Sequence, residues 1–103
     1  MRVALQWIFV IGSLSAGGPA LADYDLAGKK NCLACHQVDK RKYGPHFKEV
    51  AAKYADQKNA AEILAKKIRR GGTGVWGQDV MPAQPQVSVT EARALAQYIL
   101  SVK

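Results

Sequence analysis

The chain has 103 residues, with 15 Lys and Arg against 8 Asp and Glu, a formal net charge of +7, two cysteines and two histidines. This length allows one domain, because domains usually contain about 100–150 residues. With 49% hydrophobic and 22% charged residues, the composition excludes an intrinsically disordered chain, a collagen-like chain and a dense disulfide scaffold.

Residues 1–22 have the pattern of a Sec-type signal peptide. A positively charged start is followed by an apolar run up to Leu14, and the segment ends in Ala20-Leu21-Ala22, a cleavage motif of the A-x-A type. The apolar run is shorter than the about 20 residues that a membrane-spanning helix needs. We predict cleavage after Ala22, with Ala16 and Ala20 as alternative sites, so that residues 23–103 form the mature domain outside the cytoplasm.

The run Cys32-Leu33-Ala34-Cys35-His36 predicts covalent attachment of one c-type haem. Two thiols at this spacing can each form a thioether with one haem vinyl group, and the histidine that follows can ligate the iron. The alternatives fit less well. A thioredoxin-like dithiol would accompany a βαβ pattern that the chain lacks, a structural zinc would need four ligands, and a disulfide here would close a very small loop. We expect the run at the end of a helix from Asp25 to about Cys35.

Gly44-Pro45-His46 follows the haem motif after a short loop. Pro45 is a turn former, and its carbonyl can also accept a hydrogen bond from His36 Nδ1–H and so fix the tautomer of this ligand. The short tether between the two histidines should keep His46 on the same side of the haem as His36. His46 is therefore a weaker candidate for the distal ligand.

Three further helices are predicted, and the predicted fold class is all-α. The first runs from Phe47 to about Tyr54, with apolar residues at a spacing of three and four. The second begins with a capping box from Asn59 to Glu62 and ends at Gly71-Gly72. The third begins with a box from Ser88 to Glu91 and carries an apolar stripe of Ala92, Leu95, Ala96, Ile99 and Leu100. The sequence has no strand pattern, internal repeat or second domain, so we expect about four helices wrapped around one haem.

The glycine-rich loop before the last helix carries the candidate distal ligand. Without residues 1–22, Met81 is the only methionine and Trp76 the only tryptophan of the chain. Ligation by a histidine and a thioether is typical of electron-transfer cytochromes, so we favour Met81 over His46 or an open iron position. Pro82 restricts the backbone of Met81. Trp76 is either a core aromatic or a donor to a haem propionate, and the two roles are compatible.

With these motifs the chain resembles a class I c-type cytochrome of the small bacterial cytochrome c-551 (cytochrome c8) type. The likeness spans nearly all of the mature chain. It rests on the haem motif, Gly44-Pro45, Val50-Ala51-Ala52-Lys53-Tyr54, Gly74-Val75-Trp76-Gly77, Met81-Pro82 and the C-terminal helix with Tyr98.

The resemblance implies a role for individual residues. Cys32 and Cys35 would form the thioethers, and His36 and Met81 would be the axial iron ligands. Trp76 would donate a hydrogen bond to a propionate. Lys67 stands where relatives have a basic propionate partner, and Gln84 stands near a family asparagine that approaches the methionine sulfur. His46 and Gly72 depart from the usual family pattern.

The resemblance also implies a soluble periplasmic monomer that carries single electrons and is not an enzyme. Its partners would be membrane-bound or periplasmic redox proteins. The donor would be a cytochrome bc complex or another cytochrome, and the acceptor a nitrite reductase, a cytochrome c peroxidase or a terminal oxidase. An enzyme or gas sensor would instead need an open iron position.

The net positive charge of the chain indicates a protein partner rather than nucleic acid. Export, the lack of a recognition motif and the lack of a long basic run all argue against nucleic-acid binding. Basic residues near the haem edge would steer an acidic partner at salt-dependent rates. The candidates are Lys29, Lys30, Lys40, Arg41 and Lys42.

Overall fold

The computed structural model describes residues 19–103. Within that range it has α1 (Pro19–Lys29), the short 3-10 helix η1 (Cys32–Ala34), α2 (Phe47–Tyr54), α3 (Ala60–Arg70) and α4 (Val89–Ser101). The β-type pairing of the described residues is limited to an isolated bridge between Gly72 and Met81. The predicted all-α fold class is therefore confirmed. Residues 1–18 of the predicted signal peptide lie outside the described residues.

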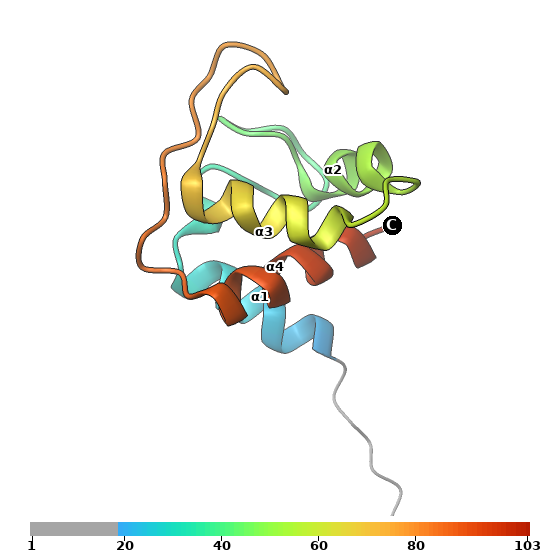
Figure 1. The fold of residues 1–103 in the computed structure, drawn as a ribbon, viewed down its shortest axis with the longest axis vertical. Helices are drawn as coiled ribbons and strands as arrows, with labels where there is room; N and C mark the ends of the chain where they lie inside the picture. Colours follow the sequence, from blue (N-terminus) through green and yellow to red (C-terminus); the bar gives the residue numbers. More distant parts are fainter. Residues whose placement is uncertain (1–18) are drawn as a thin grey trace, which may run out of the picture.

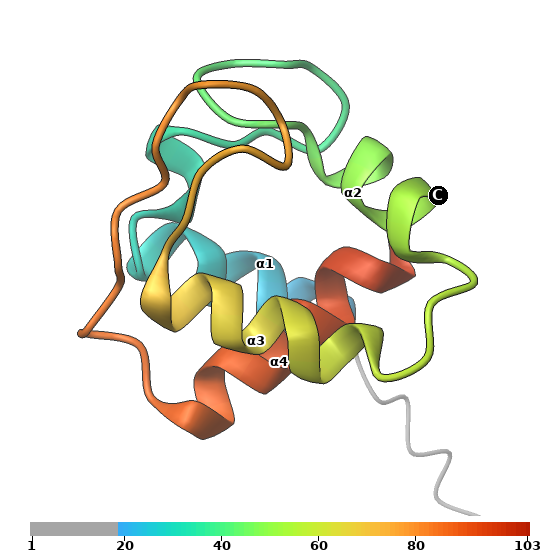
Figure 2. The same cartoon turned by 45° about the horizontal axis from the view of Figure 1, so that its top comes forward.

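Helix α4 is the centre of the packing, because it contacts α1, α2 and α3. Figures 1 and 2 show α4 alongside α3, with α1 close by. Leu95 of α4 is 1% exposed, and Val87, just before this helix, is fully buried. Burying a side chain of this size stabilises the fold by about 1.5–3 kcal/mol. The main core therefore lies where α4 meets the other helices, and we call this part (α1, α3 and α4) the helical side.

Two long loops, residues 36–46 and 71–86, lie side by side at the other end of the molecule (Figures 1 and 2). We call them the loop side. They are joined by a hydrogen bond of 3.0 Å from Arg41 Nη2 to the carbonyl oxygen of Trp76. Helix α2 begins directly after the first loop and α3 ends directly before the second. The loops are therefore held at both ends by helices of the core.

The apolar spacing of α2 and α3 accounts for the face that each helix buries. Helix α2 buries the four residues that the sequence predicts, Phe47, Val50, Ala51 and Tyr54. Helix α3 buries Ala60, Leu64 and Ile68, which follow each other at one-turn intervals. Half of the intervening positions of α3 are charged, and all of them stay exposed or half-exposed.

The ends of the last two helices test the predicted caps. The box at Ser88 is confirmed, because Ser88 Oγ accepts from Glu91 N–H and Glu91 Oε1 accepts from Ser88 N–H, both at 3.0 Å. Helix α3 ends at Gly71, as predicted, with φ at 70°. The box predicted from Asn59 to Glu62 is wrong. Asn59 has a left-handed backbone with φ at 60° and its side chain caps nothing, whereas a box needs an extended residue at this position.

Helix α2 has a capping box that the sequence analysis did not predict. His46 Nδ1 accepts a hydrogen bond of 3.1 Å from Glu49 N–H, and Glu49 Oε1 accepts one of 3.0 Å from His46 N–H. The imidazole nitrogen thus takes the place of the serine or threonine hydroxyl of the usual motif. The His46 side chain is therefore engaged as the N-cap of α2.

The helix predicted from Asp25 to about Cys35 is divided in the structure. Helix α1 ends at Lys29, and Asn31 then takes a left-handed backbone with φ at 66° before η1 begins. Asparagine tolerates this conformation better than most residues. The haem motif therefore lies on its own turn, closed by a hydrogen bond of 3.0 Å from His36 N–H to the Cys32 carbonyl.

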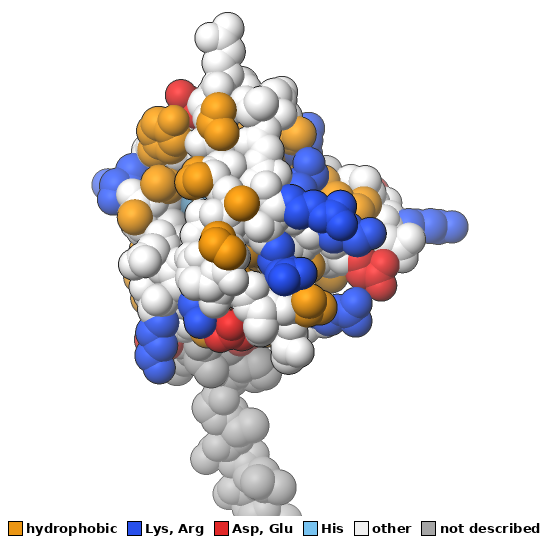
Figure 3. All heavy atoms as spheres, turned by 60° about the vertical axis from the view of Figure 1, so that its left-hand side comes forward, with side chains coloured by type: hydrophobic (Ala, Val, Ile, Leu, Met, Phe, Trp, Pro, Cys, Tyr) orange, Lys and Arg blue, Asp and Glu red, His pale blue; other side chains and the backbone are white. Residues whose placement is uncertain are grey.

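The described surface is rich in basic side chains. Figure 3 shows the face that carries the second loop and the end of α3, where Lys and Arg side chains gather beside one acidic side chain. Among residues 19–103, no helix combines the length and the apolar character needed to cross a membrane.

Candidate functional site

A cavity of about 210 Å³ lies between the helical side and the loop side. On this measure one water molecule needs about 10–15 Å³, and protein interiors contain few voids larger than a water molecule. The lining is mostly apolar with a few polar groups, which is typical of a ligand site. A cavity of this size in so short a chain indicates a place for a large bound group.

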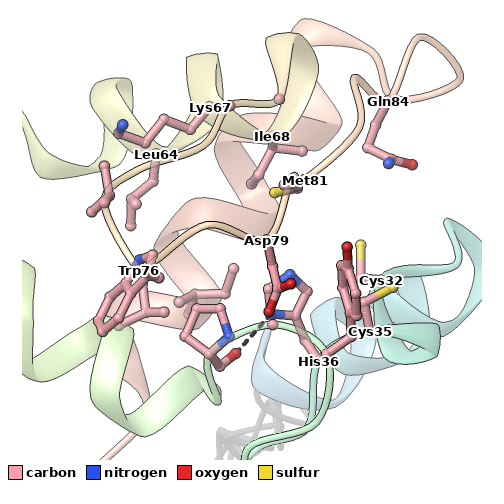
Figure 4. A pocket seen from close by; sticks show the side chains of 18 of the residues that line it. Cys32, Cys35, His36, Leu64, Lys67, Ile68, Trp76, Asp79, Met81 and Gln84 are labelled. Carbon is pink, nitrogen blue, oxygen red and sulfur yellow. Dashed lines mark hydrogen bonds between the residues drawn. The ribbon is translucent and has the colours of Figure 1, made fainter.

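The structure brings all the predicted site residues to this one cavity. Its lining includes Cys32, Cys35, His36, Pro45, Lys67, Trp76 and Met81. Figure 4 shows Met81 on the upper wall and His36 below it, with the two cysteines at one end and Trp76 at the other. His46 is absent from the lining, because its ring caps α2. The cavity thus collects residues that are up to 49 positions apart in the sequence.

His36 is held by three neighbours. Its Nδ1 lies 2.7 Å from the carbonyl oxygen of Pro45. A carbonyl can only accept, so Nδ1 carries the proton and Nε2 is free to ligate a metal. The ring stacks on Phe47, with centroids 5.7 Å apart. It also passes so close to Gly44 that a Cβ there would lie 2.6 Å from His36 Cε1. Glycine at position 44 therefore allows the ring to take this orientation.

The two cysteines are free thiols, and both are half-buried. Burial raises the pKa of the Cys32 thiol, against the smaller opposite effect of a backbone hydrogen bond. A nucleophilic redox dithiol has the reverse property, a pKa lowered by a nearby positive charge or a helix N-terminus. Cys32 therefore lacks the lowered pKa that activates a thioredoxin-like dithiol.

Met81 is positioned by its backbone. Met81 N–H donates to the Gly72 carbonyl, and Gly72 N–H donates to the Met81 carbonyl, both at 2.9 Å. Gly71, with φ at 70°, brings α3 against this segment so closely that a Cβ would collide with the Met81 carbonyl oxygen. The end of α3 and the methionine are thus joined by a two-bond bridge. The sequence contains no strand signal that could have predicted this bridge.

Two basic residues, Arg41 and Lys53, contact Trp76. Its carbonyl accepts the hydrogen bond from Arg41, and Lys53 Nζ lies 5.4 Å from the centre of its ring. A cation at this distance from an indole is attracted to the ring face. Both contacts come from segments far away in the sequence. The sequence analysis therefore did not predict the contact of Lys53 with Trp76, and it assigned Arg41 only to partner steering.

The structure separates the remaining candidates. Lys67 lines the cavity from α3. Gln84 also lines it, and its amide donates to the Pro82 carbonyl at 3.0 Å. Lys30 is engaged elsewhere, in an ion pair of 3.2 Å with Glu91. Of the five basic residues expected at the haem edge, Arg41 alone lines the cavity.

The cavity fits a haem by the chemistry of its donors. Two free thiols lie at one end, an imidazole with a fixed tautomer and a thioether lie on facing walls, and the rest of the lining is mainly apolar. Soft sulfur and imidazole ligands of this kind suit haem iron.

Comparisons with known proteins agree with this arrangement. The family model described as cytochrome c matches residues 24–103. Cytochrome c-552 of Nitrosomonas europaea is 50% identical over 103 residues, covering 100% of both chains. Cytochrome c-551 of Pseudomonas aeruginosa is 43% identical over 101 residues, covering 97% of this chain and 96% of that protein.

The similarity extends to a solved structure. The crystal structure of wild-type Nitrosomonas europaea cytochrome c552 has a TM-score of 0.76 and 54% identity, covering 78% of this chain and 99% of that chain. The fold is thus the small class I cytochrome c fold, with covalently bound haem c as cofactor. The chain belongs to the cytochrome c family, as a small class I c-type cytochrome of the c-551 type.

Proposed function

We propose that this cytochrome is a periplasmic carrier that moves single electrons between respiratory redox partners and catalyses no reaction of its own. When bound, the haem supplies an iron that takes up and releases one electron. The observation that carries the proposal is the convergence of the haem motif (Cys32–His36) and Met81 on one cavity. Two protein ligands would leave no open position for a substrate.

In this proposal Cys32 and Cys35 anchor the haem as thioethers, and His36 and Met81 ligate its iron. The hydrogen bond from His36 to the Pro45 carbonyl supports the first axial role, because it keeps Nε2 unprotonated. The backbone bridge from Gly72 supports the second, because it holds Met81 at the cavity wall. Both axial ligands then stay in place in either redox state, and little has to reorganise.

Trp76 and Lys67 are the proposed propionate contacts. Both line the cavity, one from the second loop and one from α3. The indole N–H and the ammonium group are donors without acceptor capacity, and carboxylates are their natural partners. Two such donors would stabilise ionised propionates inside a largely apolar site.

Export is proposed from residues 1–22, with cleavage after Ala22. The basic start, the apolar run and the A-x-A motif support it. Helix α1 begins at Pro19, so cleavage there would shorten this helix by its first turn. N-terminal sequencing of the protein purified from the periplasm tests this part.

Redox partners would dock at the mouth of the cavity. Three apolar residues of the lining are among the most exposed of the described chain: Tyr43 (51%), Val75 (44%) and Val80 (55%). Arg41 lies beside them and would favour an acidic partner. A cytochrome bc complex or another cytochrome is the proposed donor. A nitrite reductase, a cytochrome c peroxidase or a terminal oxidase is the proposed acceptor, in short-lived complexes of a monomer.

An optical experiment tests the function. The ferric protein should show the charge-transfer band of a methionine–iron bond, and Met81→Ala should lose it. The reduced wild-type protein should bind carbon monoxide slowly, and Met81→Ala rapidly. A high-spin ferric spectrum or rapid carbon monoxide binding in the wild type would overturn the carrier and favour an enzyme or a gas sensor. His46→Ala is the control, because His46 caps α2 outside the cavity, and it should leave the band in place.

A further inference from the structure

A second hollow lies on the opposite side of α3 from the haem cavity. It has a volume of about 390 Å³ and is formed by α3 and the first half of α4. Its charged lining residues are Glu62, Lys66, Arg69, Arg70 and Arg93. The neighbouring residues Lys67 and Ile68 line the haem cavity instead, so α3 separates the two sites. We call the second hollow the basic groove.

The cations of the basic groove are exposed and only partly engaged. Arg93 pairs with Glu62 at 3.5 Å, and both side chains are 57% exposed. Arg69 Nε donates to the Val87 carbonyl at 3.2 Å, which directs its guanidinium. Among residues 19–103, no carboxylate lies within 4.0 Å of Lys66 or Arg70.

Helix stability accounts for part of this charge only. Arg69 and Arg70 lie in the last turn of α3, where cations interact favourably with the helix dipole. Lys66 and Arg70, however, are like charges four positions apart, a spacing that destabilises a helix. Arg93 lies near the N-terminus of α4, where the dipole favours acidic residues. Helix stability therefore does not explain why Lys66 and Arg70 have the same charge or why Arg93 is basic.

We propose that the basic groove docks an acidic segment of a protein partner. Four cations against one carboxylate leave a net positive groove, and arginine guanidinium groups bind carboxylates with two parallel hydrogen bonds. The Glu62–Arg93 pair shows that a carboxylate can pair with a cation of this lining. The uncharged part of the lining is aliphatic (Ala65, Val89 and Ala92) and suits the methylene groups of aspartate and glutamate.

A protein segment fits the basic groove better than a membrane surface does. The lining is concave and contains no tryptophan, phenylalanine or leucine, the residues that insert into lipid from basic amphipathic surfaces. A partner held here would leave the mouth of the haem cavity uncovered, because α3 lies between the two sites. The proposal depends on the groove alone, so failure of the proposed carrier function would leave it intact.

The first test is a titration of the reduced, haem-loaded protein with a short poly-glutamate peptide, followed by amide NMR shifts. Shifts should concentrate at α3 and the first half of α4. Lys66→Gln/Arg70→Gln should weaken binding about 3- to 10-fold. The double variant removes two ion pairs with the peptide, and each exposed pair contributes at most about a factor of five. Lys40→Gln/Lys42→Gln is the matched control, because it removes the same charge from exposed residues of the first loop. It should weaken binding less than about 2-fold, because salt screens charges that do not contact the peptide.

A second pair of variants tests the sign of the effect. Glu62→Gln releases Arg93 and should tighten peptide binding, whereas Asp39→Asn, with the same change in net charge at an exposed loop residue, should have a smaller effect. Equal effects within either pair of variants would show a response to net charge alone and would overturn the proposal. Vesicles with anionic phospholipid serve as the other probe. Binding to them that depends on Lys66 and Arg70, without peptide binding, would overturn it in favour of a membrane contact. Unchanged absorption spectra and thermal unfolding verify that each variant is folded.

Discussion

The helical side and the loop side are held together by different kinds of contact. On the helical side, Leu95 and Ala96 are almost completely buried among apolar side chains from several helices. On the loop side, the cavity wall depends on a few particular contacts, among them the bridge from Gly72 to Met81 and the hydrogen bond from Arg41. Stability therefore depends on many contacts on the helical side, whereas the geometry of the site residues depends on single contacts on the loop side. Variants should therefore separate loss of stability from loss of site geometry.

Leu95→Ala should give the largest effect. Removing a buried leucine side chain leaves a cavity and typically costs about 2–5 kcal/mol in the free energy of unfolding, and Leu95 is 1% exposed. Chemical denaturation of the haem-loaded protein, followed by circular dichroism, measures this cost. Leu95 also lines the haem cavity. The backbone bridge that holds Met81 does not involve it, so the methionine–iron band of the folded fraction should stay in place. Leu100→Ala, at a half-buried position of the same helix, should cost clearly less, and an equal cost would contradict the packing.

Gly71→Ala should come next and should act on the site. The backbone at position 71 has φ at 70° and ψ at −169°, a conformation that other residues rarely adopt, at a strain of about 1–3 kcal/mol. The new Cβ would also collide with the Met81 carbonyl, so the methionine–iron band should weaken and carbon monoxide binding should accelerate.

Gly72→Ala is the matched control for this variant. A Cβ there meets nothing within 4 Å, and its backbone groups would still pair with Met81. The comparison between the two sides fails if both glycine variants behave alike, or if Gly71→Ala lowers stability without any effect on the optical band.

Ser88→Ala acts where the second loop passes into α4. Loss of an N-cap hydroxyl typically costs about 1 kcal/mol, and we expect this from Ser88 without a change in the optical band.

The hydrogen bond from Ser88 N–H, with a smaller effect from Lys30, lowers the pKa of Glu91 below its ordinary value of 4.5. The stability contributed by ionised Glu91 is therefore present above that value and is lost as pH falls below it. Unfolding of Glu91→Gln against wild type should show a difference at neutral pH that shrinks in acid, and a constant difference would exclude this linkage.

Arg41→Gln should have the smallest effect on stability. The hydrogen bond to the Trp76 carbonyl is exposed, so water competes for both groups. We therefore expect a cost of about 0.5 kcal/mol, the low end of what a hydrogen bond contributes. Hydrogen exchange should nevertheless accelerate for amides of residues 73–79, because this bond joins the two loops. Lys40→Gln removes a neighbouring charge without breaking the bond and should leave exchange unchanged. Exchange that is equally fast in both variants would show that Arg41 does not fasten the loops.

Much of the helical structure could be predicted because helices follow a local pattern. The spacing from Phe47 to Tyr54, the box at Ser88 and the end at Gly71 depend on residues within one or two turns. The errors also lie at helix ends. Asn59 has the right side chain for a cap, but its backbone is left-handed, and residue type alone does not report this conformation. His46 caps α2 because its imidazole Nδ1 accepts a hydrogen bond from Glu49 N–H. Residue type alone does not report this role of a histidine.

The sequence by itself determined the fold class, the haem motif and the short list of distal ligands, because helix periodicity, thiol spacing and the scarcity of methionine are properties of the chain. Only the tertiary structure decided how Met81 is held, what fastens Trp76, which lysine pairs with Glu91 and where the basic groove lies. These features join residues that are distant in the chain. Their formation depends on how helices pack and where loops cross, and no local propensity encodes that.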